Sequence, residues 1–412
     1  MPDPVFVVSA DATKHVLNGR EAFHRSGAVF GGDDDTPTSR VSYGLLAMNG
    51  KEHRKHRLPL VGALRDRTRF RAYFDATTEA VHRLIAGWQV GQTIEVVAAM
   101  RQLSIRVIAA VTLGITSDRD VVRIAGALED WISYSLLPSN RLSNKLAVIP
   151  SQAYVLSRRL EETVMAIVCE RPLDQLPPIA AWLRSNFEAG DISRQAFIGQ
   201  LVTLLSAGWE TTSSALSWAL LLLTQHKDMA VALTESLRSS AQPLGHAEAA
   251  THLGLTGVIC ETLRLFSPAI GVKRIAVGHQ VVAGYDVPDR AEVICSQFVR
   301  HRDESVYVDA LKFMPERWQT RLVQSADYFP FGLGWRRCVG DQLAVIQMRS
   351  ALSYLLRAFS FRPASGTVVD YQVRLAMSPT PTLYLTLHPA GVWPGGDEVN
   401  GTWRRLWRDK AE

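Results

Sequence analysis

A single cysteine in a glycine-rich loop constrains this chain more than any other feature. The loop, residues 331–340, reads FGLGWRRCVG, with Cys338 near its end. Apolar residues recur at helical spacing over 343–359, which predicts a helix directly after the loop. The helix dipole, together with Arg336 and Arg337, would favour the thiolate over the thiol. A thiolate in a loop that lets a flat partner approach closely is suited to bind haem iron.

Two other uses of Cys338 remain open at this point. A free cysteine can pack as a small apolar side chain, and a cysteine can bind zinc. Zinc needs partners at short spacing, whereas the other cysteines are scattered singly: Cys169, Cys260 and Cys295. The same scatter speaks against a disulfide scaffold and indicates a reducing compartment.

The composition is that of an ordinary globular protein. Of the 412 residues, 47% are hydrophobic and 21% are charged, and no linker, repeat or low-complexity block divides the chain. The net charge of +5 is a modest excess that does not by itself indicate nucleic acid. No signal peptide pattern opens the chain and no charge-free apolar run reaches membrane length. We therefore expect a cytoplasmic, soluble protein without a membrane anchor.

A long apolar helix contains a second unusual stretch. The pattern predicts a helix from Ser193, as N-cap, to about Leu223, and its apolar residues on nearly all sides imply burial. Near its centre stand Gly208, at a cost of roughly 1 kcal/mol against alanine, and Glu210, whose burial is costly unless it is paired. Such choices tend to mark functional sites. The alternative is a helix kink satisfied by back-bonding of Thr211.

A basic stretch, HRKHR at residues 53–57, opens another predicted helix. His53 and Arg57 lie one turn apart on one face, where they could hold carboxylates together. A solvated basic face or a nucleic-acid patch is the alternative. An alternating basic run follows: Arg65, Arg67, Arg69 and Arg71.

Together these stretches resemble the haem-thiolate monooxygenases, the cytochrome P450 family. The family's cysteine loop, F-x-x-G-x-R-x-C-x-G, is reproduced at five positions: Phe331, Gly334, Arg336, Cys338 and Gly340. The sequence AGWETT at 207–212 matches the oxygen-activating stretch A-G-x-[DE]-T-T. Residues 53–57 match H-x-x-x-R and 261–264 match E-x-x-R. The motifs follow the family's order, and the resemblance covers roughly residues 5–388.

The resemblance implies a mainly α, triangular single domain with small β-sheets over residues 1–388. A strand at 5–8 and a short helix at 10–17 would begin it, because the family's first helix and first strand are largely missing here. The tail, 389–412, is expected to be loosely packed, with a partner or membrane-surface contact through Trp403 and Trp407 as the alternative.

For the cofactor, the resemblance implies haem b, iron protoporphyrin IX, with Cys338 as the metal ligand. Arg274 would contact a haem carboxylate. The full set expected to touch the cofactor is Cys338, His53, Arg57, Arg274, Arg336, Phe331, Gly332, Ala207 and Gly340.

In the oxygen-activating stretch, Gly208 would leave room for dioxygen, Thr211 would hydrogen-bond the oxygen bound at the iron, and Glu210 would help to relay protons. Three residues would only brace the cysteine loop: Glu261, Arg264 and Arg317. His301 stands where the family commonly has asparagine, a change that we expect to be tolerated.

The implied activity is oxidation of a bound organic molecule with dioxygen and two electrons. A ferredoxin and its reductase would supply the electrons, and the basic run at 65–71 could receive an acidic partner. The substrate would be small and mostly hydrophobic, in secondary metabolism, and the protein a monomer. Positions that would shape its pocket are Ser206, Trp209, 269–272 and 377–380. The alternatives are oxidative coupling or peroxide-driven oxidation, or a non-catalytic haem-binding protein.

Overall fold

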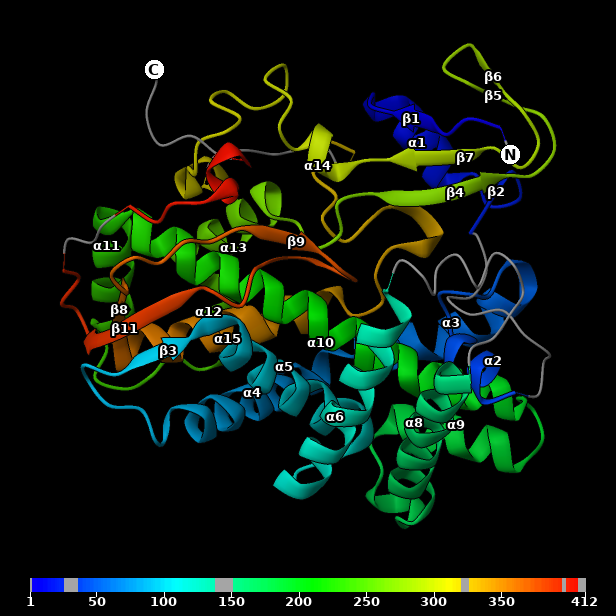
Figure 1. Ribbon diagram of the computed structural model, residues 1–412, viewed down its shortest axis with the longest axis horizontal. Coiled ribbons are helices and arrows are strands. Elements are labelled where there is room, and N and C mark those ends of the chain that lie inside the picture. Colours follow the sequence, from blue (N-terminus) through cyan, green and yellow to red (C-terminus); the bar gives the residue numbers. More distant parts are fainter. Residues whose placement is uncertain (1, 26–35, 138–150, 320–325, 395–397, 407–412) are drawn as a thin grey trace.

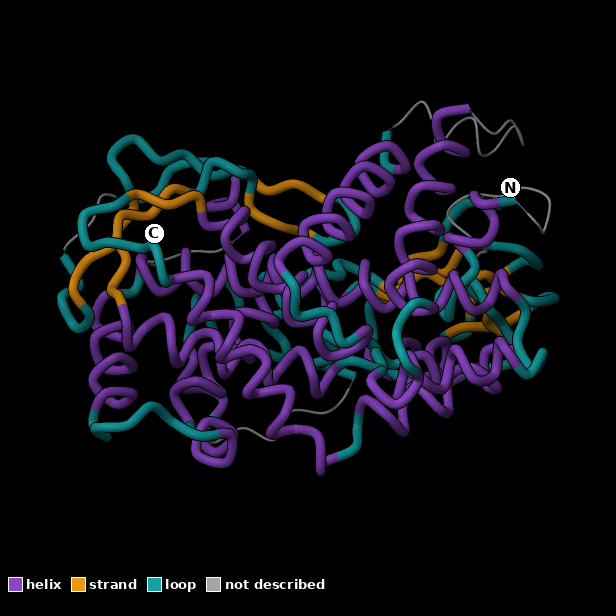
Figure 2. The backbone as a smooth tube through the Cα atoms, turned by 90° about the horizontal axis from the view of Figure 1, so that it is seen from below, coloured by secondary structure: helices purple, strands orange, loops and turns teal. Residues whose placement is uncertain are grey.

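The structure, a computed structural model, describes residues 2–25, 36–137, 151–319, 326–394 and 398–406. Helices fill the middle of the molecule, and small sheets lie at its two ends (Figure 1; Figure 2). This mainly α architecture with small sheets confirms the expected fold class. The helices are α1 Ala10–Asn18, α2 Pro37–Ser42, α3 Gly50–Leu64, α4 Phe70–Ile85, α5 Val96–Leu113, α6 Asp118–Ser135, α8 Ser151–Cys169, α9 Pro178–Glu188, α10 Arg194–Gln225, α11 Lys227–Arg238, α12 His246–Thr251, α13 Leu253–Leu265, α14 Gln297–Arg300 and α15 Asp341–Ala358.

The long helix α10 runs through the centre of the molecule (Figure 1). Ser193 caps its N-terminus by accepting a hydrogen bond from the amide of Ala196, as the sequence predicts. Residues on all sides of α10 are buried, because α5, α2, α13 and α15 surround it. Helix α5 is also apolar and long enough to span a membrane by composition, and 67% of it is buried inside this fold.

Two sheets frame the helical core. The four-stranded sheet has the order β1-β7-β4-β2, and the three-stranded sheet has the order β3-β11-β8. The predicted first strand is β1, which pairs in parallel with β7 at an edge of the larger sheet. The strands are β1 Val5–Val7, β2 Phe23–His24, β3 Thr93–Glu95, β4 Val272–Ala276, β5 Gln280–Val282, β6 Tyr285–Val287, β7 Glu292–Cys295, β8 Phe359–Pro363, β9 Tyr371–Val373, β10 Met377–Pro379 and β11 Tyr384–Pro389.

The tail packs against the core, so the expectation of loose packing is wrong for its described residues. Trp403 is fully buried, and its indole N–H donates to the carbonyl of Val399 at 3.1 Å. The amide of Val399 donates in turn to Gln225 at the end of α10. Gly401 has a φ of 123° and lies so close to the backbone of Val369 that a side chain would overlap it. Trp407 lies outside the described residues.

Replacing Trp403 with alanine is expected to lower the free energy of unfolding by about 3–5 kcal/mol, because a buried indole leaves a large cavity. Urea unfolding followed by circular dichroism measures the loss. Tyr285→Ala serves as control, since Tyr285 is 75% exposed. An equal, small effect of both substitutions would mean that the tail contributes nothing to stability.

Candidate active site

The cysteine loop is closed by its own backbone. The amide of Cys338 donates to the carbonyl of Phe331 at 2.8 Å, and the amide of Gly332 donates to Phe329 at 2.8 Å. Gly332 and Gly334 have φ angles of 71° and 68°, in the left-handed region that favours glycine. Helix α15 begins at Asp341, which confirms the predicted helix after the loop.

Cys338 is an exposed residue, yet many protein atoms surround its sulfur. Burial raises the pKa of this thiol, and the hydrogen bond from the backbone of Gly340 and the nearby cations Arg57 and Arg65 work in the opposite direction. The free sulfur is therefore not a ready thiolate. A metal bound directly to it would stabilise the deprotonated form.

The expectation that Arg336 and Arg337 acidify this thiol is wrong. The Arg336 guanidinium turns away to the carbonyl of Met48 and the side chain of Asn49. Arg337 pairs with Asp341 at 2.9 Å. Although both arginines are close to Cys338 in the sequence, their charged groups point away from its sulfur.

The zinc interpretation of Cys338 lacks ligands. Within the described ranges, no group of three or more histidine, cysteine, aspartate or glutamate side chains could hold a metal ion. All four cysteines are free thiols.

A cluster of cations lies beside the cysteine loop, and four predicted cofactor contacts belong to it. We call these four residues the cation cluster: His53 and Arg57 from α3, Arg274 from β4, and Arg336 from the loop. The side chains of His53 and Arg274 are both only 2% exposed. The His53 and Trp335 rings are perpendicular with centroids 4.7 Å apart, and the Arg336 guanidinium carbon lies 4.6 Å from the centroid of the Trp335 ring.

The cation cluster has no counter-ion in the described part of the chain. Its three arginines make no ion pair there, and buried ring or guanidinium nitrogens of His53, Arg274 and Arg336 have no hydrogen-bond partner. Burial, followed by the charges of neighbouring arginines, lowers the pKa of His53 to about 3 and of Arg336 to about 9. Burial together with Arg25 lowers the pKa of Arg274 to about 10. His53 is therefore neutral near pH 7 and can donate a hydrogen bond, while the three arginines are charged. Buried guanidinium groups without anions are costly, so the cluster fits a ligand with carboxylates, such as haem.

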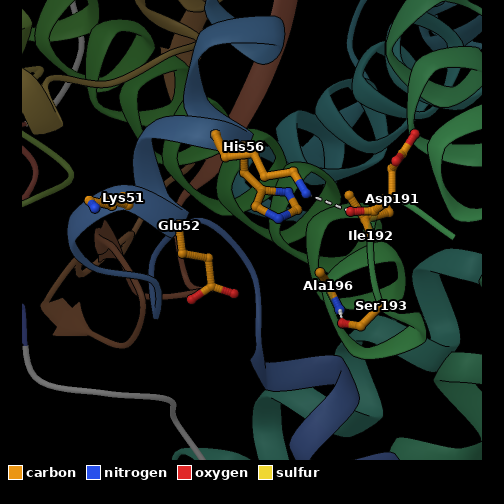
Figure 3. Close-up of a pocket in the computed structure, with 8 residues that line it drawn as sticks. Lys51, Glu52, His56, Asp191, Ile192, Ser193 and Ala196 are labelled. Carbon is orange, nitrogen blue, oxygen red and sulfur yellow. Dashed lines mark hydrogen bonds between the residues drawn. The ribbon is translucent and has the colours of Figure 1, made fainter.

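Lys55 and His56, two other members of the basic stretch on α3, face elsewhere. The Lys55 ammonium donates to the carbonyl of Asp191 at 2.6 Å. Buried His56 lines a hollow of about 460 Å³ between α3 and the turn that precedes α10 (Figure 3). Both lysines and carboxylates line this hollow, so it is not a basic patch. Only His53 and Arg57 of this stretch join the cation cluster.

The centre of α10 presents Ala207 and Thr211 on one accessible side. The Thr211 hydroxyl donates to the carbonyl of Ala207 at 2.7 Å, so the back-bonding that the alternative interpretation requires is present. Gly208 is expected to make room for dioxygen, which stays a prediction. A side chain there would also collide with Ile108 of α5, so close packing of the two helices is a second reason for glycine at this position.

Glu210 is buried and belongs to a partly buried network that the sequence did not reveal. The Arg101 guanidinium of α5 donates to Glu210 and also to Glu129 of α6. Glu129 accepts further hydrogen bonds from Ser133, at 2.7 Å, and from Arg374, at 3.2 Å. Burial opposes the charged form of Glu129, but Ser133 and the two arginines outweigh it and lower its pKa. The single sequence signal for this network is that a buried carboxylate needs a partner.

Trp209 does not line a pocket, contrary to expectation. It is 4% exposed, its indole N–H donates to the carbonyl of Arg101 at 2.9 Å, and the Arg101 guanidinium lies 4.3 Å from its ring. Trp209 therefore holds Arg101 in place.

The ion pair predicted between Glu261 and Arg264 is present and fully buried. Their side chains meet at 2.8 and 2.9 Å, and both are 0% exposed. Arg317 donates to Glu261 at 2.9 Å, as expected for the third member of this network.

Comparisons with known proteins agree with this geometry. The family model described as Cytochrome P450 matches residues 178–387. The chain is 25% identical to a pentalenene oxygenase of Streptomyces avermitilis, over 83% of this chain and 78% of that protein. It is 31% identical to a cyclooctatin synthase of Streptomyces melanosporofaciens, over 50% of this chain and 44% of that one.

The fold agrees as well. The crystal structure of the cytochrome P450DA heme domain superposes with a TM-score of 0.78 at 19% identity, over 93% of this chain and 87% of that chain. The family model covers more than half of the sequence. The chain belongs to the cytochrome P450 family, the haem-thiolate monooxygenases.

Proposed function

We propose that this monooxygenase holds haem b through Cys338 and oxidises a small, mostly hydrophobic molecule with electrons from a ferredoxin. The observation that carries the proposal is the cation cluster, which has no anionic partner among the described residues and lies beside an exposed cysteine. Haem bound by a thiolate supplies the redox chemistry that activates dioxygen.

In this proposal each predicted contact has a physical task. The sulfur of Cys338 binds the iron, and the cation cluster pairs with the two haem carboxylates. Phe331 and Gly332 lie in the loop ahead of the sulfur, and a Cβ at Gly340 would lie 4.0 Å from it, an ordinary contact distance. Ala207 offers a small, exposed side chain on α10.

Thr211 and Glu210 would handle protons. The Thr211 hydroxyl donates its hydrogen bond to the carbonyl of Ala207, so its lone pairs are left to accept a hydrogen bond on the accessible side of α10. Glu210 is held by Arg101 and has to leave it to carry a proton inward. Because Arg101 also contacts Glu129, it keeps one carboxylate partner when Glu210 turns away.

A hydrophobic substrate is supported by the residues at the two segments expected to shape the pocket. These segments lie side by side, because the amide of Met377 donates to the carbonyl of Pro268 at 2.8 Å. Ile270, in the first segment, is 39% exposed. The relatives named as a pentalenene oxygenase and a cyclooctatin synthase, both from Streptomyces, support a role in bacterial secondary metabolism.

A ferredoxin is supported by cations next to the cysteine loop. Arg65 donates to the carbonyl of Cys338 at 3.4 Å, so the basic run begins beside the loop. The positive charge of this basic run is partly compensated, since Arg65, Arg69 and Arg71 each pair with an aspartate. Arg67 makes no ion pair within the described residues. An acidic partner would be attracted to this side, with a strength that falls as salt is added.

Reconstitution with a ferredoxin, its reductase and NADPH tests the proposal. Thr211→Ala is expected to keep consuming NADPH, while product formed per NADPH falls by about tenfold or more, because proton delivery contributes factors of this size. Thr211→Ser keeps the hydroxyl and should restore most of the yield. Product formation and NADPH consumption are measured by mass spectrometry and absorbance.

Two of the alternatives predict other outcomes. A non-catalytic haem carrier consumes no NADPH with any candidate substrate. A peroxide-driven enzyme forms product with hydrogen peroxide and none with the ferredoxin. Equal yields from Thr211→Ala and the unmodified protein would remove the assigned role of the hydroxyl.

A further inference from the structure

His301, directly after α14, is a fully buried histidine outside the cation cluster and the oxygen-activating stretch. It connects two distant segments. One ring nitrogen, Nε2, lies 3.0 Å from the amide nitrogen of Phe329, and the other, Nδ1, lies 3.2 Å from the carbonyl oxygen of Arg264. An amide can only donate, so Nε2 is the acceptor and Nδ1 carries the proton. A single neutral tautomer satisfies both contacts.

The partner on one side of His301 is the buried network around Glu261. The Arg264 guanidinium donates to the carbonyl of His301 at 2.6 Å, in addition to its ion pair with Glu261. The His301 ring also stacks on Tyr328, with centroids 5.3 Å apart. Burial lowers the pKa of His301 to about 3, so the ring stays neutral and Nε2 stays an acceptor near neutral pH.

The partner on the other side is the start of the cysteine loop. The carbonyl of Phe329 accepts from Gly332, and the carbonyl of Phe331 accepts from Cys338, both at 2.8 Å. The hydrogen bond from the amide of Phe329 to His301 therefore holds the first of these residues in place. The two backbone hydrogen bonds then connect Phe329 to Gly332 and Phe331 to Cys338.

We propose that His301 is a positioning residue for Cys338: it transmits the rigidity of the Glu261–Arg264 pair to the cysteine loop and so fixes the place of the sulfur. The inference rests on the proposed role of Cys338 as iron ligand. An asparagine at this position would be shorter than histidine, and its amide would not extend as far from the backbone as Nε2 does. The length of the histidine side chain thus determines how far the Arg264 carbonyl of α13 lies from the Phe329 amide at the start of the loop.

Two substitutions at this position separate the contact from the packing. His301→Phe keeps an aromatic ring for Tyr328 but leaves the amide of Phe329 without an acceptor. His301→Gln places an amide oxygen near the position of Nε2 and should restore the contact. Trp393→Phe is the matched control, because it removes another buried hydrogen bond, to Thr234 at 3.1 Å, and keeps the ring.

Hydrogen exchange of the Phe329 amide and the carbon monoxide spectrum of the reduced haem protein are measured on all four proteins. In His301→Phe, exchange at Phe329 should accelerate by about tenfold, the effect expected of one lost hydrogen bond. The fraction with the far-red Soret band of a thiolate ligand should fall. His301→Gln should recover both properties, and Trp393→Phe should change neither.

The outcomes separate this proposal from the one on which it rests. If the unmodified protein lacks the far-red band, the role of Cys338 fails, and the exchange rates still test the contact made by His301. If His301→Phe keeps both the slow exchange and the band, His301 does not position the loop. A loss of the band in Trp393→Phe as large as in His301→Phe would assign the effect to general destabilisation and overturn the proposal.

Discussion

Replacing Cys338 with serine is expected to abolish the far-red Soret band of the reduced protein with carbon monoxide and to reduce product formation to background. A serine hydroxyl is a far weaker acid than a thiol, so it supplies no anionic sulfur to the iron. The cation cluster is unchanged by this substitution, so haem should still be bound to a measurable extent. Carbon monoxide difference spectra and haem content per polypeptide are the measurements.

Cys169→Ser is the control for this substitution, because Cys169 is a half-buried free thiol at the end of α8. It should keep both the band and the activity. If Cys338→Ser retains the far-red band, another residue binds the iron, and the assignment of the cysteine loop is wrong.

The parts of this site that the sequence predicts are local ones. The N-cap Ser193, the all-round burial of α10 and the helix after the cysteine loop follow from residue spacing along one segment. The ion pair of Glu261 and Arg264 follows as well, since the two lie three residues apart among apolar neighbours.

The partners that come from other segments could not be predicted. Glu210 meets Arg101, which lies 109 positions away on α5 and belongs to no motif. The charges of Arg336 and Arg337 were assigned to the nearest thiol, but side-chain direction sent them to Asn49 and Asp341. The sequence shows where a charged side chain is attached to the backbone, but it does not show in which direction that side chain points.

The tail shows a different limit. Glycine and proline correctly indicate irregular backbone, and irregular backbone was equated with loose packing. Trp403 is instead part of the main core, near Phe266 with ring centroids 6.3 Å apart. Periodicity detects regular elements only, so a buried side chain on an irregular segment gives no signal.

Glu261→Gln is expected to lower the free energy of unfolding by about 3–5 kcal/mol, the usual cost of breaking a buried ion pair from one side. Glu261 accepts five hydrogen bonds, from the backbone and side-chain donors Met314, Arg264 (two), Arg317 and Trp318. Glutamine has the same shape but brings an amide donor to a site lined by donors, and it leaves two buried guanidinium groups without their anion. Urea unfolding with a haem-absorbance readout measures the effect.

The same substitution at an exposed pair shows whether burial is the cause. Glu162 pairs with Arg158 at 2.8 Å, one turn apart on α8, and both side chains are more than 60% exposed. Because water and salt screen such a pair, Glu162→Gln should leave the unfolding midpoint unchanged within error. Since His301 transmits the position of Arg264 to the cysteine loop, Glu261→Gln should also reduce the far-red carbon monoxide band before the protein unfolds globally. A variant that unfolds earlier but keeps the full band up to its midpoint would show that the network stabilises the fold without placing the sulfur.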